Sequence, residues 1–285
     1  MVKTSWDQLD QQTCQLLLIN TVALYEAWCY EISSAFYSAG VISEKKQRDY
    51  QGSLQYPNHY GPKPKDGINS TVKKLASADG VSAAMTALMS SVLPSAVDEA
   101  TFTPRMRIYR LFKEARNSIS HRGSVVGNEV CDAYNDCAAL SPADIGMRKA
   151  PEFPAPVLGE QVRLSWRGII GLSDMLRRVV ADVDHLLMCT KTAELDLIER
   201  LRTDPAALQD PSEAGSVATY RYAKKLPDGP WIVTRAQLER GQSTIYSAAV
   251  RLLGLTKSRK EDFLVLWPDL LARGTVEIHS SLRDS

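Results

Sequence analysis

Apolar residues recur at helical spacing through most of the first 205 residues. The first such run covers residues 7–37, and its apolar positions are Leu18, Val22, Tyr25, Cys29, Ile32 and Phe36. At about 100° per residue these positions fall on one side of a helix. A shorter apolar run, 83–93, stops before Pro94, and the range 128–140 repeats the spacing with Val130, Tyr134 and Cys137. The pattern predicts a long helix over 7–37 and a further short helix over 128–140.

The longest periodic segment covers residues 160–202, and we expect one long helix there. Gly168 and Gly171 are candidate bending points, and Asp204-Pro205 is expected to end the helix. Residues 38–74 instead hold many glycines and prolines, which predicts a long loop. The proline-rich stretch 141–159 has the character of a linker.

The pattern changes after residue 205. Short β-prone runs at 217–222 and 231–234 flank the turn Pro227-Asp228-Gly229-Pro230. Two helices are expected at 235–253 and 260–271, and an edge strand at 275–279. The sequence thus predicts an all-α fold, with a helical domain over 1–205 and a small, mostly helical C-terminal appendage over 206–285 whose role the residues do not indicate.

Composition excludes several classes of protein. Hydrophobic residues make up 44% of the chain and charged residues 24%, with a net charge of +1, as in soluble globular proteins. No apolar run is long enough to span a membrane, and the N-terminus leads directly into a predicted helix, so we expect neither a membrane anchor nor a signal peptide. The five cysteines form no CxxC pair and no histidine lies at ligand spacing from one. We expect reduced thiols in a cytoplasmic protein, with no metal and no cofactor.

One predicted helix, 104–123, carries candidate chemistry at its end. Its apolar stripe comprises Ile108, Phe112, Ala115 and Ile119. Asn117 and His121 stack on roughly the opposite side, with Arg116 at the edge between the two faces. A guanidinium, an amide and an imidazole therefore gather at one helix end, and these groups suit the binding and cleavage of a phosphodiester.

The spacing of these residues resembles the signature of the HEPN superfamily. The shared pattern is Arg116 followed by Asn117, with His121 five positions after the arginine, at the end of an amphipathic helix. The resemblance covers roughly residues 5 to 202, and it implies a HEPN-like antiparallel helical bundle. Many members are metal-independent endoribonucleases that act as dimers in toxin, abortive-infection and CRISPR-linked defence systems.

The resemblance also implies roles for individual residues. Arg116, Asn117 and His121 are the candidate catalytic residues, with Arg122 and Ser120 in supporting positions. HEPN-like domains often carry an acidic residue on an early helix near the motif arginine, and Glu26, with Glu31 as the substitute, is the candidate here. A homodimer or higher oligomer is expected, because one histidine per chain cannot be both acid and base in the same step.

One departure concerns regulation. HEPN toxins that a nucleotidyltransferase antitoxin silences carry a tyrosine two residues past the motif histidine, where this chain has Gly123. That mode of silencing is therefore not expected. A partner protein of another kind, either an antitoxin or a defence protein, is still an open alternative.

The expected loop at 38–74 is a candidate RNA contact. Basic side chains bind phosphates and aromatic rings stack on bases, and this segment interleaves the two kinds. The candidate RNA-binding residues are Lys45, Lys46, Arg48, Tyr56, Tyr60, Lys63 and Lys65. A solvated loop with no ligand is an equally good interpretation.

Three functional hypotheses follow from the motif. The first is a metal-independent endoribonuclease that cleaves RNA by attack of the 2′-hydroxyl. The second is a non-catalytic HEPN-like module that binds nucleotide or a partner protein. The third is a helical scaffold in which Arg116 complements the helix dipole and His121 is simply solvated.

Overall fold

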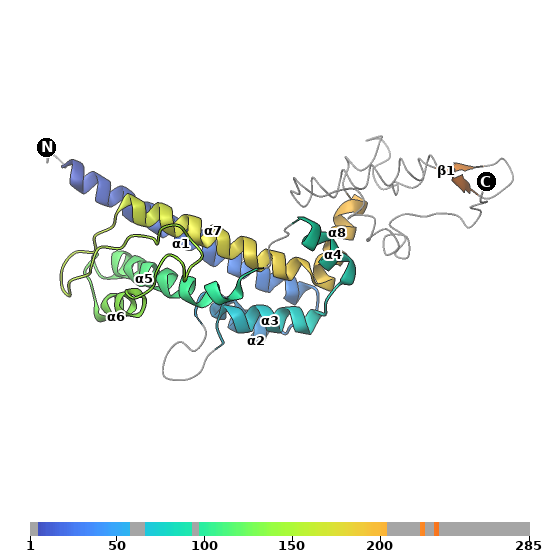
Figure 1. Ribbon diagram of the computed structural model, residues 1–285, viewed down its shortest axis with the longest axis horizontal. Coiled ribbons are helices and arrows are strands. Elements are labelled where there is room, and N and C mark those ends of the chain that lie inside the picture. Colours follow the sequence, from blue (N-terminus) through green and yellow to red (C-terminus); the bar gives the residue numbers. More distant parts are fainter. Residues whose placement is uncertain (1–4, 58–65, 93–96, 204–222, 226–230, 234–285) are drawn as a thin grey trace. The chain divides into compact units, whose positions relative to one another are not determined.

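The structure is a computed structural model, and it describes residues 5–57, 66–92, 97–203, 223–225 and 231–233. The predicted all-α fold is confirmed, because helices dominate the described residues (Figure 1). The chain divides into two compact units. Unit 1 comprises residues 1–78 and 97–186, and unit 2 comprises 79–96 and 187–285. The predicted boundary at 205 lies outside the described residues.

Helix α1 (Trp6–Ser38) forms one long side of unit 1. It begins with a capping box between Ser5 and Gln8, which satisfies backbone groups at its first turn. The predicted stripe is buried except for Ile32, which is half-buried. The buried members are Leu18, Val22, Tyr25, Cys29 and Phe36.

Helix α7 (Trp166–Met188) runs parallel to α1. Gln11 Nε2 donates to the Leu164 carbonyl oxygen at 2.8 Å, and Trp28 Nε1 donates to Asp184 Oδ1 at 3.2 Å. Residue numbers rise in the same direction along both segments, so the two helices are parallel. Helix α5 (Phe102–His121) lies against α1 and runs opposite to it (Figure 1). The bundle of unit 1 therefore mixes parallel and antiparallel neighbours.

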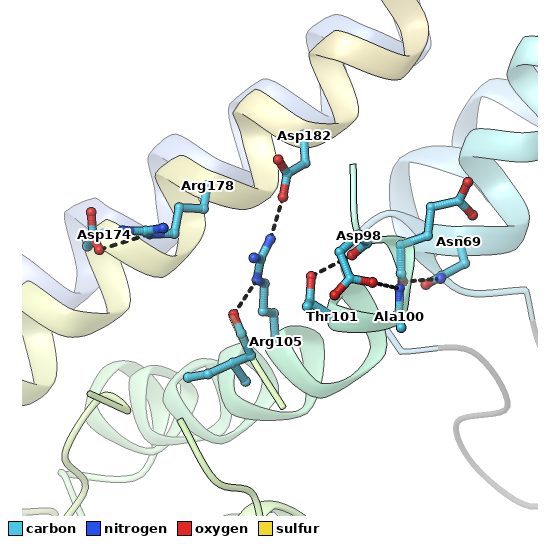
Figure 2. Close-up of polar contacts among 10 residues, drawn as sticks. Asn69, Asp98, Ala100, Thr101, Arg105, Asp174, Arg178 and Asp182 are labelled. Carbon is cyan, nitrogen blue, oxygen red and sulfur yellow. Dashed lines mark hydrogen bonds and ion pairs between the residues drawn. The ribbon is translucent and has the colours of Figure 1, made fainter. Parts of the chain in front are cut away.

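Arg105 fastens α5 to α7 from inside the protein. Its Nε donates to the Ile145 carbonyl oxygen at 2.9 Å and its Nη1 to Asp182 Oδ2 at 2.5 Å. Figure 2 shows the guanidinium reaching from α5 up to Asp182 on α7. Because the Arg105 side chain is only 6% exposed, this pair fixes the start of α5 in place.

The predicted loop at 38–74 is wrong, because two helices occupy much of it. Helix α2 (Glu44–Ser53) buries only Tyr50, so it has no apolar stripe to reveal it. It is held by the Ser43 cap and by an ion pair between Glu44 and Arg48. Helix α3 (Ile68–Asp79) has a clear apolar face, formed by Ile68, Val72 and Leu75.

The single helix predicted over 160–202 is also wrong. Helix α7 ends at Met188, and α8 (Lys191–Thr203) begins three residues later. Helix α7 continues through Gly168 and Gly171, which serve close packing. A Cβ at Gly168 would lie 2.2 Å from the Glu152 carbonyl oxygen, so glycine lets the proline-rich segment approach the helix.

The helices predicted over 104–123 and 128–140 match α5 and α6 (Asn128–Cys137) to within a few residues, and most of the apolar run at 83–93 also forms a helix. Helix α4 (Ala83–Val92) lies in unit 2, η1 (Glu99–Thr101) leads into α5, and α6 packs against α5. In unit 2, Asp79 accepts from the Thr192 backbone N–H at 2.6 Å, which caps the start of α8.

A small hairpin accounts for the described residues near the C-terminus. Strand β1 (Ala223–Lys225) pairs antiparallel with β2 (Trp231–Val233), and β2 matches the β-prone run predicted at 231–234. The other predicted elements of the appendage lie outside the described residues, namely 217–222, 235–253, 260–271 and 275–279.

Candidate active site at the end of α5

The motif occupies the last turn and a half of α5, and His121 is the final helical residue. The helix ends there because Gly123 and Ser124 both take positive φ angles, 62° and 64°, which reverse the chain. Three backbone hydrogen bonds then join residues 124–126 to residues 159–162, including Val126 N–H to the Glu160 carbonyl oxygen at 2.8 Å. The turn brings the start of α6 back beside the motif.

A hollow of about 380 Å³ lies at this helix end. Its lining comprises Glu114, Asn117, Ser118, His121, Arg122 and Glu129. The amide and the imidazole thus share one concave surface, as the helical wheel predicted for Asn117 and His121. His121 is exposed, whereas Ser118 below it is buried.

Arg116 is held by α1 and does not line the hollow. Its Nη2 donates to Glu26 Oε2 at 2.5 Å, and its Nη1 donates to Asn117 Oδ1 at 3.2 Å. The Arg116 side chain is 19% exposed and that of Glu26 29%. A carboxylate 90 residues away in sequence therefore orients the motif arginine through a partly desolvated ion pair.

Lys113 is a second cation on the same carboxylate, and it is not among the residues predicted from the sequence. Its Nζ lies 3.0 Å from Glu26 Oε1 and donates to Gln55 Oε1. The ammonium also lies 5.3 Å from the centroid of the Tyr56 ring. The spacing held a signal, because residues three apart on a helix are neighbours, so a lysine three positions before Arg116 shares its face.

This cluster is buried enough to perturb a neighbouring group. Burial raises the pKa of the Tyr109 phenol, and the Glu26 carboxylate raises it further. Tyr109 is fully buried and its ring packs edge-on against Tyr25. The Glu26 carboxylate, flanked by two cations, therefore lies partly buried between α1 and α5.

Arg122 forms a separate pair at the rim of the hollow. Its two Nη atoms donate to the two carboxylate oxygens of Glu129 at 2.5 and 2.9 Å. The hydrogen bonds from Arg122 lower the pKa of Glu129 to about 2, and the same bonds raise the pKa of Arg122. Both side chains are about half exposed, so this pair faces solvent.

The charges around the hollow do not favour an anion as they stand. Glu114 and Glu129 supply two carboxylates, and Arg122 is the cation among the lining residues. Asn117 is engaged as well, because its Nδ2 donates to Glu114 Oε2 at 3.3 Å. Its amide thus contacts Glu114 and Arg116.

The other predicted residues are spread over unit 1. Glu31 is exposed on α1, about 140° around the helix from Glu26. Ser120 is exposed on α5. Lys45, Lys46 and Arg48 are exposed on α2, where Arg48 pairs with Glu44.

Tyr56 follows α2, and its half-buried ring contacts Lys113. Tyr60, Lys63 and Lys65 lie outside the described residues. Of the predicted supporting residues, the structure therefore brings Glu26 and Arg122 next to the motif.

Among the residues that the structure describes, no cluster of three or more His, Cys, Asp or Glu side chains is arranged to hold a metal ion. None of the described helices has the length and apolar character needed to cross a membrane. All five cysteines are free thiols, and burial raises the pKa of Cys29 to about 12.

Comparisons with family models, with curated proteins and with solved structures find no match to this chain. Fold class and site geometry are therefore the observations on which a function can be proposed.

Proposed function

We propose that this protein is a metal-independent endoribonuclease of the HEPN type. The observation that carries the proposal is the joint placement of the motif residues. Asn117 and His121 line one hollow. Arg116, next to Asn117, is held by a 2.5 Å hydrogen bond from its Nη2 to Glu26 Oε2. An arginine fixed by a partly buried carboxylate and an exposed histidine within one helical turn and a half supply a charge clamp and a proton-transfer group.

RNA supplies the nucleophile for this chemistry. The 2′-hydroxyl lies beside the scissile phosphorus, so cleavage needs no metal-bound water. His121 takes the 2′-proton as the 2′-oxygen bonds to phosphorus, and the bond to the 5′-oxygen breaks. The leaving 5′-oxygen receives a proton from a second group, which yields a 2′,3′-cyclic phosphate and a 5′-hydroxyl. The Arg116 N–H groups not engaged by Glu26 and Asn117 stabilise the added charge on the phosphate oxygens.

The second proton-transfer group is expected to come from a second copy of the chain. A two-fold dimer that brings two His121 side chains to one cleft supplies both an acid and a base. By the same resemblance we place the protein in the cytoplasm of a prokaryote, in phage defence or a toxin–antitoxin system. The α2 residues Lys45, Lys46 and Arg48 are exposed and remain candidates for RNA phosphate contacts.

A second candidate function has an observation in its favour. The lining of the hollow has more carboxylates than cations, and Arg116 is already neutralised by Glu26. Of the two ligands expected for a non-catalytic HEPN-like module, nucleotide or a partner protein, the partner protein fits such a site better, because the carboxylates repel the phosphates of a nucleotide. The two candidates differ in whether His121 transfers a proton.

The test is cleavage of labelled RNA in EDTA by wild type, Arg116→Ala, Arg116→Lys and His121→Ala. We expect each variant to lose activity by about 100-fold or more, since a proton-transfer group or a charge clamp contributes on that scale. Arg116→Lys should be poor because lysine lacks the planar fork. Arg107→Ala, at an exposed position of the same helix, is the matched control and should keep full activity.

The products and the subunit mixture decide between the alternatives. Cyclic-phosphate ends in the presence of chelator support the proposal, whereas activity that EDTA abolishes and Mg²⁺ restores would overturn it. If the site is shared between subunits, mixed dimers of wild type and His121→Ala lose activity. Loss in proportion to the mutant fraction would show that each chain holds a complete site.

A further inference from the structure

The Arg122–Glu129 pair has a geometry that the mechanism above does not use. We propose that Arg122 binds a phosphate of the RNA backbone beside His121, and that the carboxylate of Glu129 occupies this anion position until RNA displaces it. This inference rests on the proposed function, because it names a further substrate-binding residue of the same hollow.

The pair uses both arms of the guanidinium. Arg122 Nη1 lies 2.5 Å from Glu129 Oε2, and Nη2 lies 2.9 Å from Oε1. This parallel fork is the arrangement by which arginine binds carboxylates and phosphates alike. A non-bridging pair of phosphate oxygens can therefore take the place of the two carboxylate oxygens without a new arginine conformation.

The backbone beside the pair is shaped for an anion. Glu129 lies in the first turn of α6, where the carboxylate accepts a hydrogen bond from its own backbone N–H. The preceding cap, Gly127, provides no side-chain bond to that turn. The N–H groups in the first turn of α6, a ten-residue helix, thus add to the positive potential of Arg122 at the position of the Glu129 carboxylate.

Gly127 also keeps this position open. A Cβ at residue 127 would lie 2.5 Å from Arg122 Nη1 and 2.8 Å from Glu129 Oε2. A side chain at this position would make the ends of both flexible side chains shift. The glycine therefore lets the pair lie against the start of α6, at the rim of the hollow.

Exposure makes the exchange feasible. The side chains of Arg122 and Glu129 are 51% and 49% exposed, whereas Arg116 is held in the interior by Glu26. Exposed ion pairs contribute little to stability, so separating this one costs little. His121 lines the same hollow, so a phosphate bound at Arg122 would lie within the site. Arg122 is thus the arginine at the hollow that a substrate can recruit.

The experiment measures binding in the absence of cleavage. Fluorescence anisotropy of a labelled eight-nucleotide oligouridylate is recorded with His121→Ala protein at low salt. In this background we expect Glu129→Gln to bind RNA about 3- to 10-fold more tightly, and Arg122→Ala about 5- to 10-fold more weakly, as for one charge-assisted phosphate contact. The double variant should bind as weakly as Arg122→Ala alone, because Glu129 acts through Arg122.

Asp174→Asn is the matched control. Asp174 forms exposed pairs with Arg177 and Arg178 on α7, and its neutralisation changes the net charge by the same amount. A gain in Glu129→Gln no larger than in Asp174→Asn would overturn the proposal, as would a gain that persists when Arg122 is alanine. Absence of RNA binding in every variant would overturn it as well.

The failure of this proposal and that of the nuclease are separable. The predicted binding pattern without any cleavage by the wild type leaves the anion site standing and removes the enzyme. Cleavage by the wild type with no effect of Glu129→Gln on binding does the reverse. Circular dichroism verifies that each variant is folded, which is expected because both side chains face solvent.

Discussion

Two arginines near the end of α5 each pair with a glutamate, one pair largely buried and the other about half exposed. Arg116 donates to Glu26 and Arg122 donates to Glu129, and each pair has a nitrogen–oxygen distance of 2.5 Å. The first pair joins α5 to α1 across 90 residues of sequence and is mostly buried. The second spans seven residues and is about half exposed.

Burial decides what each pair can do. Loss of one partner from a largely buried pair destabilises the protein, and such a pair holds its geometry because little water reaches either group. An exposed pair exchanges with water, salt or a ligand at little cost. In the proposed enzyme, Glu26 therefore makes Arg116 a fixed part of the site, whereas Glu129 leaves Arg122 available to substrate.

The largest expected effect is on activity at Glu26. Glu26→Ala should lower RNA cleavage by about 100-fold, because Arg116 loses the partner that orients it and displacements of about 1 Å cost that much. Initial rates under single-turnover conditions measure the effect. Glu31→Ala, exposed on the same helix, is the control and should cleave normally. Equal losses in both variants would show that α1 acts through the fold alone.

The next largest effect is on stability, where substitution of Glu26 should lower the free energy of unfolding far more than substitution of Glu129. Glu26→Ala leaves Lys113 and Arg116 without their carboxylate, at side-chain exposures of 12% and 19%. We expect the free energy of unfolding to fall by about 2 kcal/mol, less than for a fully buried pair because the Glu26 side chain is 29% exposed. Glu129→Ala should leave the Tm within about 1 °C of wild type, as exposed substitutions usually do.

Thermal unfolding followed by circular dichroism provides this comparison. Glu26→Gln is the informative intermediate, because its amide can still accept from one cation while the charge is gone. A Tm for Glu129→Ala as low as that for Glu26→Ala would contradict the distinction drawn here and would make the exposed pair a structural element.

The sequence predicted one side of this comparison better than the other. The stripe of α1 and the motif helix follow from apolar spacing, and the resemblance proposed Glu26 for Arg116. Spacing within a helix cannot, however, give its partners on other helices, so the contacts of Lys113 with Gln55 and Tyr56 had no signal. Helix α2 was missed for a related reason, because it buries one residue and shows no stripe.

The Arg122–Glu129 contact was out of reach for a local reason. Seven residues separate the pair, and they meet because Gly123 and Ser124 reverse the chain with positive φ angles. Glycine at 123 is a recognisable signal for such a turn, but serine with a positive φ is not. The length and conformation of the turn therefore decide which acidic residue lies opposite Arg122. Neither can be predicted from the residue types in the turn alone.

A smaller effect is expected from salt. Raising NaCl from about 0.05 to about 0.5 M shortens the screening length severalfold, which weakens exposed pairs far more than buried ones. The ratio of RNA affinities between Glu129→Gln and its parent should fall toward one, because salt already separates the carboxylate from Arg122. The Tm difference between Glu26→Ala and wild type should change little. A salt-independent affinity ratio would indicate that Glu129 acts by shape and not by charge.

The smallest expected effect is that of pH on the exposed pair. The Arg122 hydrogen bonds lower the pKa of Glu129 to about 2, below the ordinary value for glutamate. A lowered pKa means that the folded protein favours the ionised form. The interaction is then fully present above the ordinary glutamate range and is lost only as pH falls through about 2. The pKa of Arg122 is raised, so its charge also persists.

Between about pH 5 and 8, the ratio of RNA affinities between Glu129→Gln and its parent should therefore stay constant, since any group that titrates in both proteins cancels in the ratio. Anisotropy titrations at three pH values measure it. A ratio that shrinks toward one at pH 5, with the parent gaining affinity, would show that Glu129 takes up a proton there and that its bond to Arg122 is far weaker than the two short contacts indicate.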